Sequence, residues 1–154
     1  MPRTRHSALA AILWGGFIAG TVDIGAASLI SGYSPIVILK YVAGGLLGRG
    51  SLAGGVGNAV LGLVLQWIMS IVIAAVFVVL LRKRVTRPHL WTVWGTAYGA
   101  VVFAVMNYVV VPLSALHSVP HFSVFSFVAN LAAMLLFGWI VGFFAKLLLQ
   151  PEPA

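Results

Sequence analysis

The sequence is nearly devoid of acidic side chains. Only two of its 154 residues are Asp or Glu, and Asp, Glu, Lys and Arg together make up 7% of the chain. A water-soluble domain of this size needs more polar surface than that around its core. The scarcity of charge excludes an ordinary soluble domain, and it leaves few groups for acid–base catalysis, so we expect no enzymatic activity.

Cysteine is absent altogether, which excludes a disulfide framework and any thiolate metal site. His117 and His121 have a four-residue spacing that would suit two imidazole ligands on one helix, but Pro120 lies between them and no carboxylate is close in sequence. We therefore predict neither a metal site nor a cofactor.

Long apolar runs are what the sequence has in abundance. Apolar residues make up 62% of the chain, and the mean hydropathy is +1.11. Four runs, at about residues 9–30, 58–81, 91–111 and 122–149, are each about 20 residues or longer, enough to cross a bilayer as a helix. The basic start of the first run resembles a signal peptide, but its apolar part continues to Ile30, so we expect an uncleaved span. The sequence predicts an all-α, integral membrane four-helix bundle that forms a single transmembrane domain over residues 1–154.

A shorter element is expected between the first two spans. Ser34 and Pro35 are typical of a helix start, and the segment 35–48 that follows is too short to span and carries Lys40. It is predicted to be a short interfacial or re-entrant helix, and the sequence leaves both placements open.

The basic residues lie at the ends of the apolar runs and not along a solvated face with stacking aromatics, so the net charge of +7 does not indicate nucleic-acid binding. With both termini placed in the cytoplasm, seven basic residues lie inside and two outside, and this excess predicts cytoplasmic N and C termini. The inner set is Arg3, Arg5, Arg82, Lys83, Arg84, Arg87 and Lys146, and the outer set is Lys40 and Arg49.

The loop cluster Arg82, Lys83, Arg84 and Arg87 can also contact anionic lipid headgroups of the bilayer. Lys40 and Arg49 are expected at the outer headgroups, with pairing to Asp23 or attraction of an anion as alternatives.

Four polar side chains interrupt the four spans. Asp23 lies seven residues before Ile30, and Gln66, Asn107 and Asn130 lie at similar depths, roughly 7–12 Å below the outer ends of their helices. We predict that these four meet in one layer. Two interpretations stay open: the layer cross-links the helices, or it is an ion- or proton-binding site at the bottom of a cavity open to the outside.

Small residues form stripes on several helices. Gly16, Gly20, Asp23 and Ala27 fall on one face, which predicts that the carboxylate points into the bundle. Gly95 and Gly99 mark a similar face on the third span. Gly138 and Gly142 form a second small face on the last span, which we expect to be free for a partner such as another copy of the chain.

Three segments resemble a known group of proteins. These are Gly16 to Asp23 (GFIAGTVD), Ser34–Pro35 through Gly48, and Met106 to Ser114 (MNYVVVPLS). They resemble small, uncharacterised bacterial inner-membrane proteins, loosely the YagU-like ones. The resemblance implies a bacterial inner-membrane bundle and carries no activity or substrate with it.

The leading hypothesis is a small ion- or solute-permeation protein that uses Asp23, with Gln66, Asn107 and Asn130 as its polar lining. The alternative is a non-catalytic structural or accessory subunit of a larger membrane protein complex. Separately, small-residue stripes on several helix faces predict that the chain forms a homo-oligomer or binds a larger membrane partner.

Overall fold

The computed structural model describes residues 3–85 and 87–149, with side chains described from Ser7 onward. This part of the chain consists of helices and short connections: α1 (Arg3–Ser31), α2 (Pro35–Leu47), the 3₁₀ helix η1 (Arg49–Ala53), α3 (Val56–Val85), α4 (Leu90–Val105), the π-helical turn η2 (Met106–Val110), α5 (Val111–Leu113) and α6 (Val124–Leu149). Four stretches are long and apolar enough to cross a membrane: Ser7–Ser31, Val56–Val85, Leu90–Leu113 and Val124–Leu149. The predicted all-α bundle of four spans with a short helix after the first is confirmed, and the chain is a membrane protein.

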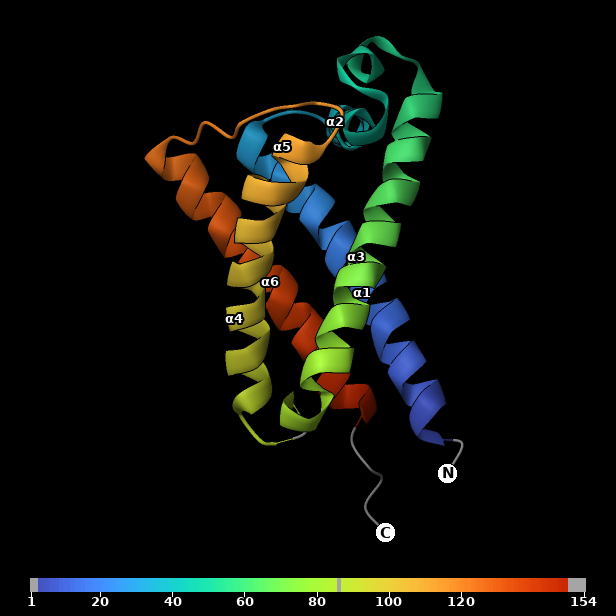
Figure 1. Ribbon diagram of the computed structural model, residues 1–154, viewed down its shortest axis with the longest axis vertical. Helices are drawn as coiled ribbons and strands as arrows, with labels where there is room; N and C mark the ends of the chain where they lie inside the picture. The colour runs from blue at the N-terminus through green and yellow to red at the C-terminus, as the bar shows by residue number, and fades with distance from the viewer. Residues whose placement is uncertain (1–2, 86, 150–154) are drawn as a thin grey trace.

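The four long helices run along the long axis of the molecule (Figure 1). The start of α1, the end of α6 and the α3–α4 connection lie together at one end, which we call the terminal end. The helices α2 and η1 and the segment 114–123 cover the other end, which we call the α2 end. Because the number of spans is even, the start of α1 and the end of α6 lie at the same end of the bundle.

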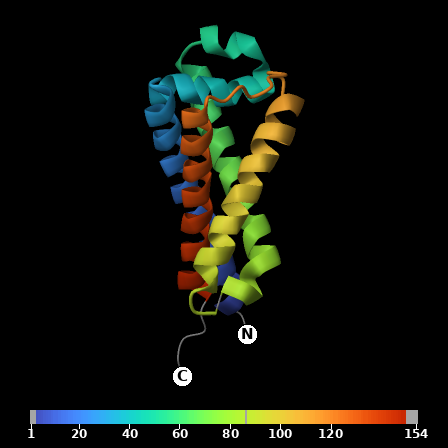
Figure 2. The same ribbon diagram turned by 90° about the vertical axis from the view of Figure 1, so that its left-hand side faces the viewer.

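The helix α2 lies across the α2 end of the bundle, crosswise to the long helices (Figure 2). Its backbone rests on α3 at Gly62, where a Cβ atom would collide with the carbonyl of Leu39. The buried Ser51 hydroxyl donates to the Lys40 carbonyl at 2.9 Å, and the Ala115 N–H donates to the Gly45 carbonyl at 2.9 Å. These contacts tie α2 to its neighbours. Of the two placements that the sequence leaves open, they favour a helix lying across the end over one dipping between the spans.

The third span extends beyond its predicted end at Pro112. We predicted an end at Val111, but the helical path runs to Leu113 through the π turn η2. In this turn the Val111 N–H donates to the Met106 carbonyl, five residues back. Proline lacks an N–H, and its ring crowds the carbonyl four residues earlier, so a locally wider turn lets the helix pass Pro112 without ending.

The helices α4 and α6 pack closely against each other through their glycines. A Cβ atom on Gly138 would lie 2.2 Å from the Gly95 carbonyl oxygen and 2.8 Å from the Gly99 Cα. A Cβ atom on Gly142 would lie 3.0 Å from the Trp91 carbonyl oxygen. The prediction that the face of Gly138 and Gly142 is free for a partner is wrong, because the glycine face of α4 in the same chain already occupies it.

Candidate functional site

Asp23 lies on the face of α1 that packs against α3. A Cβ atom on Gly16 would lie 2.6 Å from the Ile71 Cα, and one on Gly20 would lie 2.4 Å from the Ser70 Oγ. The two helices therefore approach closely just before Asp23. Since Asp23 follows Gly20 by about one helical turn, its carboxylate points at α3, as the stripe of small residues predicts.

The partner of Asp23 is Gln66. Its Nε2 donates a hydrogen bond to the Asp23 Oδ2 at 2.9 Å, and both side chains are partly buried. The bond joins two spans across 43 residues of sequence. A carboxylate inside a span is expected to be paired or to act in binding, and this contact provides the pairing.

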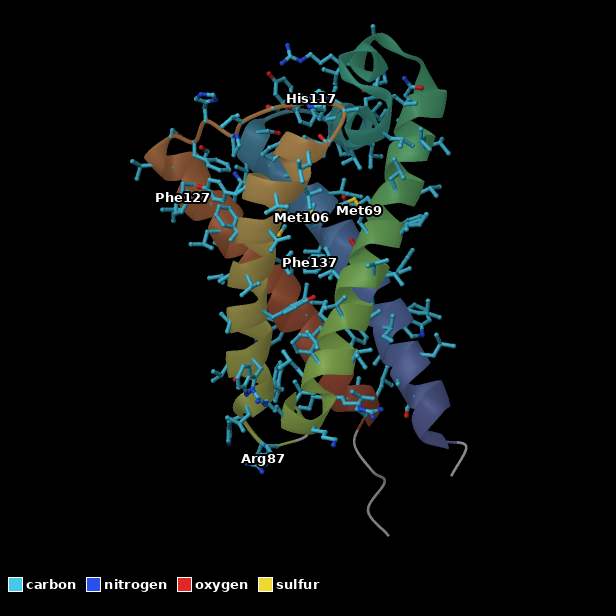
Figure 3. All side chains as sticks on the ribbon, in the orientation of Figure 1. Met69, Arg87, Met106, His117, Phe127 and Phe137 are labelled. Atoms are coloured by element: carbon cyan, nitrogen blue, oxygen red, sulfur yellow. The ribbon has the colours of Figure 1, made fainter. Side chains whose placement is uncertain are left out.

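A small cavity of about 40 Å³ lies beside this pair. All four spans contribute to its lining, which consists of Asp23, Gln66 and Ser70, then Met69, Met106 and Met134, and finally Ile73, Val102 and Phe137. Figure 3 shows Met69 and Met106 on facing helices, just above Phe137. The volume can hold one water molecule or one small ion, but it is far below the roughly 300 Å³ or more of a small-molecule site. The arrangement can bind a proton or a single ion, and it cannot hold an organic solute.

Asn107 and Asn130 lie outside this site. The Asn107 Nδ2 donates to the Phe103 carbonyl at 2.9 Å, and the Asn130 Nδ2 donates to the Ser126 carbonyl at 2.7 Å. Neither residue lines the cavity. The predicted layer of four polar side chains is thus corrected to a pair, because similar depth does not fix rotation about the helix axis, and each amide finds an acceptor one turn back on its own helix.

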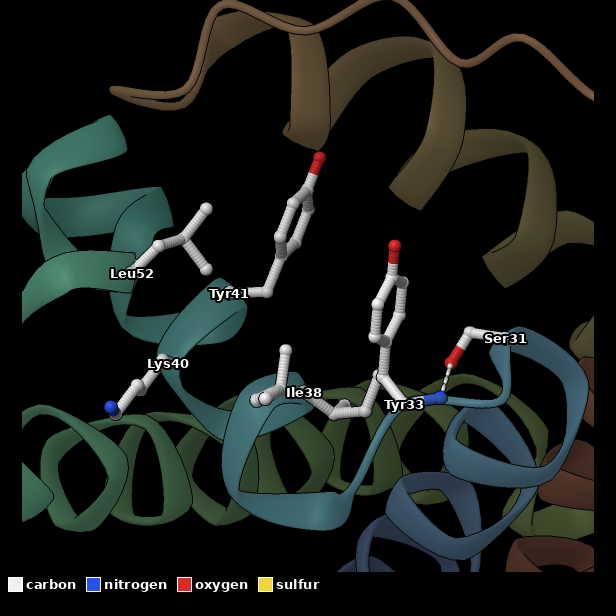
Figure 4. A pocket seen from close by; sticks show the side chains of 7 residues that line it. Ser31, Tyr33, Ile38, Lys40, Tyr41 and Leu52 are labelled. Carbon is white, nitrogen blue, oxygen red and sulfur yellow. Dashed lines mark hydrogen bonds between the residues drawn. The ribbon is translucent and has the colours of Figure 1, made fainter.

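Lys40 and Arg49 are both at the α2 end, and no ion pair joins either of them to Asp23 in the described part of the chain. Lys40 lines a cavity of about 560 Å³ with Ser31, Tyr33, Val37, Ile38, Tyr41 and Leu52. Figure 4 shows the two tyrosine rings pointing the same way and the Lys40 amine pointing away from them. Arg49 is exposed beside a smaller cavity of about 170 Å³. Both positions suit headgroup contact better than pairing with the buried carboxylate.

The basic cluster Arg82, Lys83, Arg84 and Arg87 is exposed at the terminal end, where Figure 3 labels Arg87. The Arg84 guanidinium lies 4.6 Å from the centre of the Trp94 ring, and the Lys146 Nζ lies 5.4 Å from that of Trp91. Cations stacked on tryptophan rings at a span end are typical of a membrane–water boundary. The second acidic residue of the chain, Glu152, lies outside the described residues, as do the side chains of Arg3 and Arg5.

The three methionines of the cavity were not among the residues predicted for the site. Each lies near a polar position that was recognised: Met69 is three residues after Gln66, Met106 directly precedes Asn107, and Met134 is four residues after Asn130. Only Met69 shares a helix face with a polar residue of the site, because it follows Gln66 by three residues. Met106 and Met134 accompany asparagines that lie outside the site, so their positions carried no such signal.

Comparisons with known proteins provide no relative for this chain: protein-family models, curated proteins and solved structures all give no match. The YagU-like resemblance therefore stays a prediction, and the function must be argued from the site alone.

Proposed function

We propose that this membrane protein is a small, non-enzymatic permeation or transport protein in which Asp23 binds a proton or a single cation. One observation carries the proposal. The carboxylate is held by Gln66 at 2.9 Å beside a cavity of about 40 Å³ to which all four spans contribute. The chain has only two acidic residues, and one of them, Asp23, lies inside a span. Inserting a carboxylate into a membrane costs considerable free energy, and such residues usually mark ion or proton pathways.

Two features of the pair support reversible binding. The single amide donor leaves the second carboxylate oxygen, Oδ1, available for a proton or cation. None of the nine residues that line the cavity is basic, so no fixed cation holds the carboxylate in its charged form.

We further propose a bacterial inner membrane as the location, with the terminal end in the cytoplasm. The YagU-like resemblance supports the bacterial membrane, and the distribution of charge supports the orientation. The described basic residues Arg82, Lys83, Arg84, Arg87 and Lys146 lie at the terminal end, and Lys40 and Arg49 lie at the α2 end. Lysine and arginine resist translocation, which favours the terminal end as the inner one. In this orientation the exposed cluster Arg82, Lys83, Arg84 and Arg87 meets the anionic inner leaflet.

The test is proton flux in liposomes. The purified protein is reconstituted with an internal pH-sensitive dye, and a membrane potential is imposed across the vesicles. We expect dye-reported flux above that of protein-free vesicles, and loss of this flux in Asp23→Asn. The asparagine keeps an oxygen that can accept the Gln66 hydrogen bond, so the fold is preserved.

Asn107→Leu is the matched control, because it removes an intramembrane amide that does not line the cavity. Its flux should equal that of the wild type. Wild-type flux no greater than that of empty vesicles, or undiminished flux in Asp23→Asn, would contradict the proposal.

A second candidate is the accessory subunit. It is supported by the first turns of α6, where Val124, Phe125 and Val128 are exposed at 85%, 72% and 58%. A partner protein or a second copy of the chain would cover this apolar surface in the same way as lipid. Purification in mild detergent distinguishes the candidates: a stable complex with a larger protein favours the accessory role, whereas a solitary chain or homo-oligomer counts against it.

A further inference from the structure

The methionines of this chain converge on one place. Of its four methionines, Met69, Met106 and Met134 all line the cavity beside Asp23, and they come from α3, η2 and α6. Figure 3 shows Met69 and Met106 facing each other between their helices. Three of the nine lining residues are therefore thioethers, arranged around a single carboxylate.

This donor set selects for a particular class of metal ion. Thioether sulfur is a soft, neutral ligand that favours Cu(I) and similar soft ions, whereas Mg²⁺ and Ca²⁺ prefer oxygen. The cavity of about 40 Å³ has room for one such ion without its water shell.

Charge balance points to the same class. A monovalent ion next to the Asp23 carboxylate forms a neutral unit, because the sulfur atoms and the Gln66 amide carry no charge. A divalent ion would leave an uncompensated positive charge in an apolar site, which is strongly unfavourable. A soft monovalent cation fits both the ligand type and the charge.

We infer that Met69, Met106 and Met134, together with Asp23, form an intramembrane site for a soft monovalent cation, Cu(I) or Ag(I). The inference deepens the proposed function and rests on it, since it names the class of cation that binds at Asp23 in place of a proton. The competing explanation is that the methionines only fill an irregular gap between the helices, as this flexible side chain often does.

Silver ion is the probe, because it is redox-stable and takes the same ligands. The full chain is purified in sulfur- and chloride-free detergent solution, and Ag⁺ binding is measured by equilibrium dialysis together with X-ray absorption at the silver edge. Since the chain contains no cysteine, any protein sulfur in the silver coordination shell belongs to methionine. We expect one Ag⁺ per chain with sulfur neighbours in the wild-type protein, a result that does not depend on any variant folding.

Variants locate the site. Met69→Leu, Met106→Leu and Met134→Leu nearly conserve volume, and each should weaken Ag⁺ binding by at least about tenfold, the lower end of what even an outer-shell partner contributes to a metal site. The triple variant should lose stoichiometric binding although it keeps Met1 and all four histidines. Ile68→Leu is the matched control, because Ile68 is exposed on the same helix as Met69 and does not line the cavity, so this variant should bind Ag⁺ like the wild type.

Wild-type affinity in the triple variant, or a silver shell of nitrogen and oxygen alone, would overturn the inference. The two proposals can fail separately. Asp23-dependent proton flux without sulfur-ligated Ag⁺ overturns only the metal site. Sulfur-ligated Ag⁺ with proton flux that is unchanged in Asp23→Asn overturns only the proton-transport form of the proposed function.

Discussion

Two close helix crossings in this molecule are built from glycine, and one of them lies beside a carboxylate inside the span. At the α4–α6 crossing, Gly95, Gly99 and Gly138 bring the two backbones together, and a Cβ atom on Gly99 would lie 2.2 Å from the Met134 carbonyl oxygen. At the α1–α3 crossing, Gly16 and Gly20 do the same against Ile71 and Ser70, but the Asp23–Gln66 pair and its cavity follow one turn later.

The α4–α6 crossing shows that two spans can pack tightly although no side-chain hydrogen bond joins them in the described part of the chain. A carboxylate is therefore unnecessary for holding α1 against α3. Because an intramembrane Asp is costly and a single interhelical bond contributes only about 0.6–1.7 kcal/mol, packing alone is a weak reason for Asp23 to be there. The comparison favours a binding role for the pair over a cross-linking one.

The largest effect is expected from Gly138→Val, which tests whether the close backbone contact between α4 and α6 stabilises the fold. The valine side chain would collide with the backbone at Gly95 and Gly99, which cannot move aside as a side chain can. We expect a loss in free energy of unfolding at or above the upper end of about 1–3 kcal/mol, measured by thermal or denaturant unfolding in detergent.

Gly25→Ala is the control for Gly138→Val. A Cβ atom on Gly25 meets nothing within 4 Å, so the alanine should leave unfolding nearly unchanged. Equal effects of the two substitutions would show that the glycines act through chain flexibility and not through close approach.

A smaller effect is expected at the other crossing, from a double-mutant cycle on Asp23→Ala and Gln66→Ala. Their single hydrogen bond should give a coupling free energy of about 0.6–1.7 kcal/mol in the same unfolding assay. A coupling of several kcal/mol would make the pair a major structural cross-link and would remove the contrast between the crossings. A coupling near zero would mean that the two side chains do not interact in the folded protein.

The smallest effects are expected from Asn107→Leu and Asn130→Leu. Each amide bonds only to a carbonyl of its own helix, so its loss should change the free energy of unfolding by no more than about 0.5 kcal/mol. Proton flux in liposomes should also stay at the wild-type level for both variants. Loss of flux in either one would restore the four-residue layer that the sequence suggested.

Hydropathy and composition were enough to predict the four spans and the short helix after the first, because helix formation is nearly obligatory for an apolar chain in a bilayer. The stripe of Gly16, Gly20 and Asp23 also predicted correctly that the carboxylate faces a neighbouring helix. These features depend on local sequence and period alone.

The features of the site that were not predicted depend on which helix faces contact each other. Depth along a helix can be counted from the sequence, but rotation and pairing cannot, so Asn107 and Asn130 were wrongly placed beside Asp23, and Gly138 was wrongly left unpaired. The π turn at Met106–Val110 adds to this, since it shifts the helical register at Asn107 by about one residue. Methionine went unnoticed because an apolar residue in an apolar span carries no signal until its neighbours are known.

The central claim is that Asp23 exchanges a proton with water, and infrared spectroscopy after a pH jump tests it most directly. With only Asp23 and Glu152 as acidic side chains, the carboxyl region of the spectrum is unusually simple. We predict a protonated-carboxyl band that changes with pH, disappears in Asp23→Asn and persists in Glu152→Gln. A spectrum in which no pH-dependent band is lost on substitution of Asp23 would contradict the account.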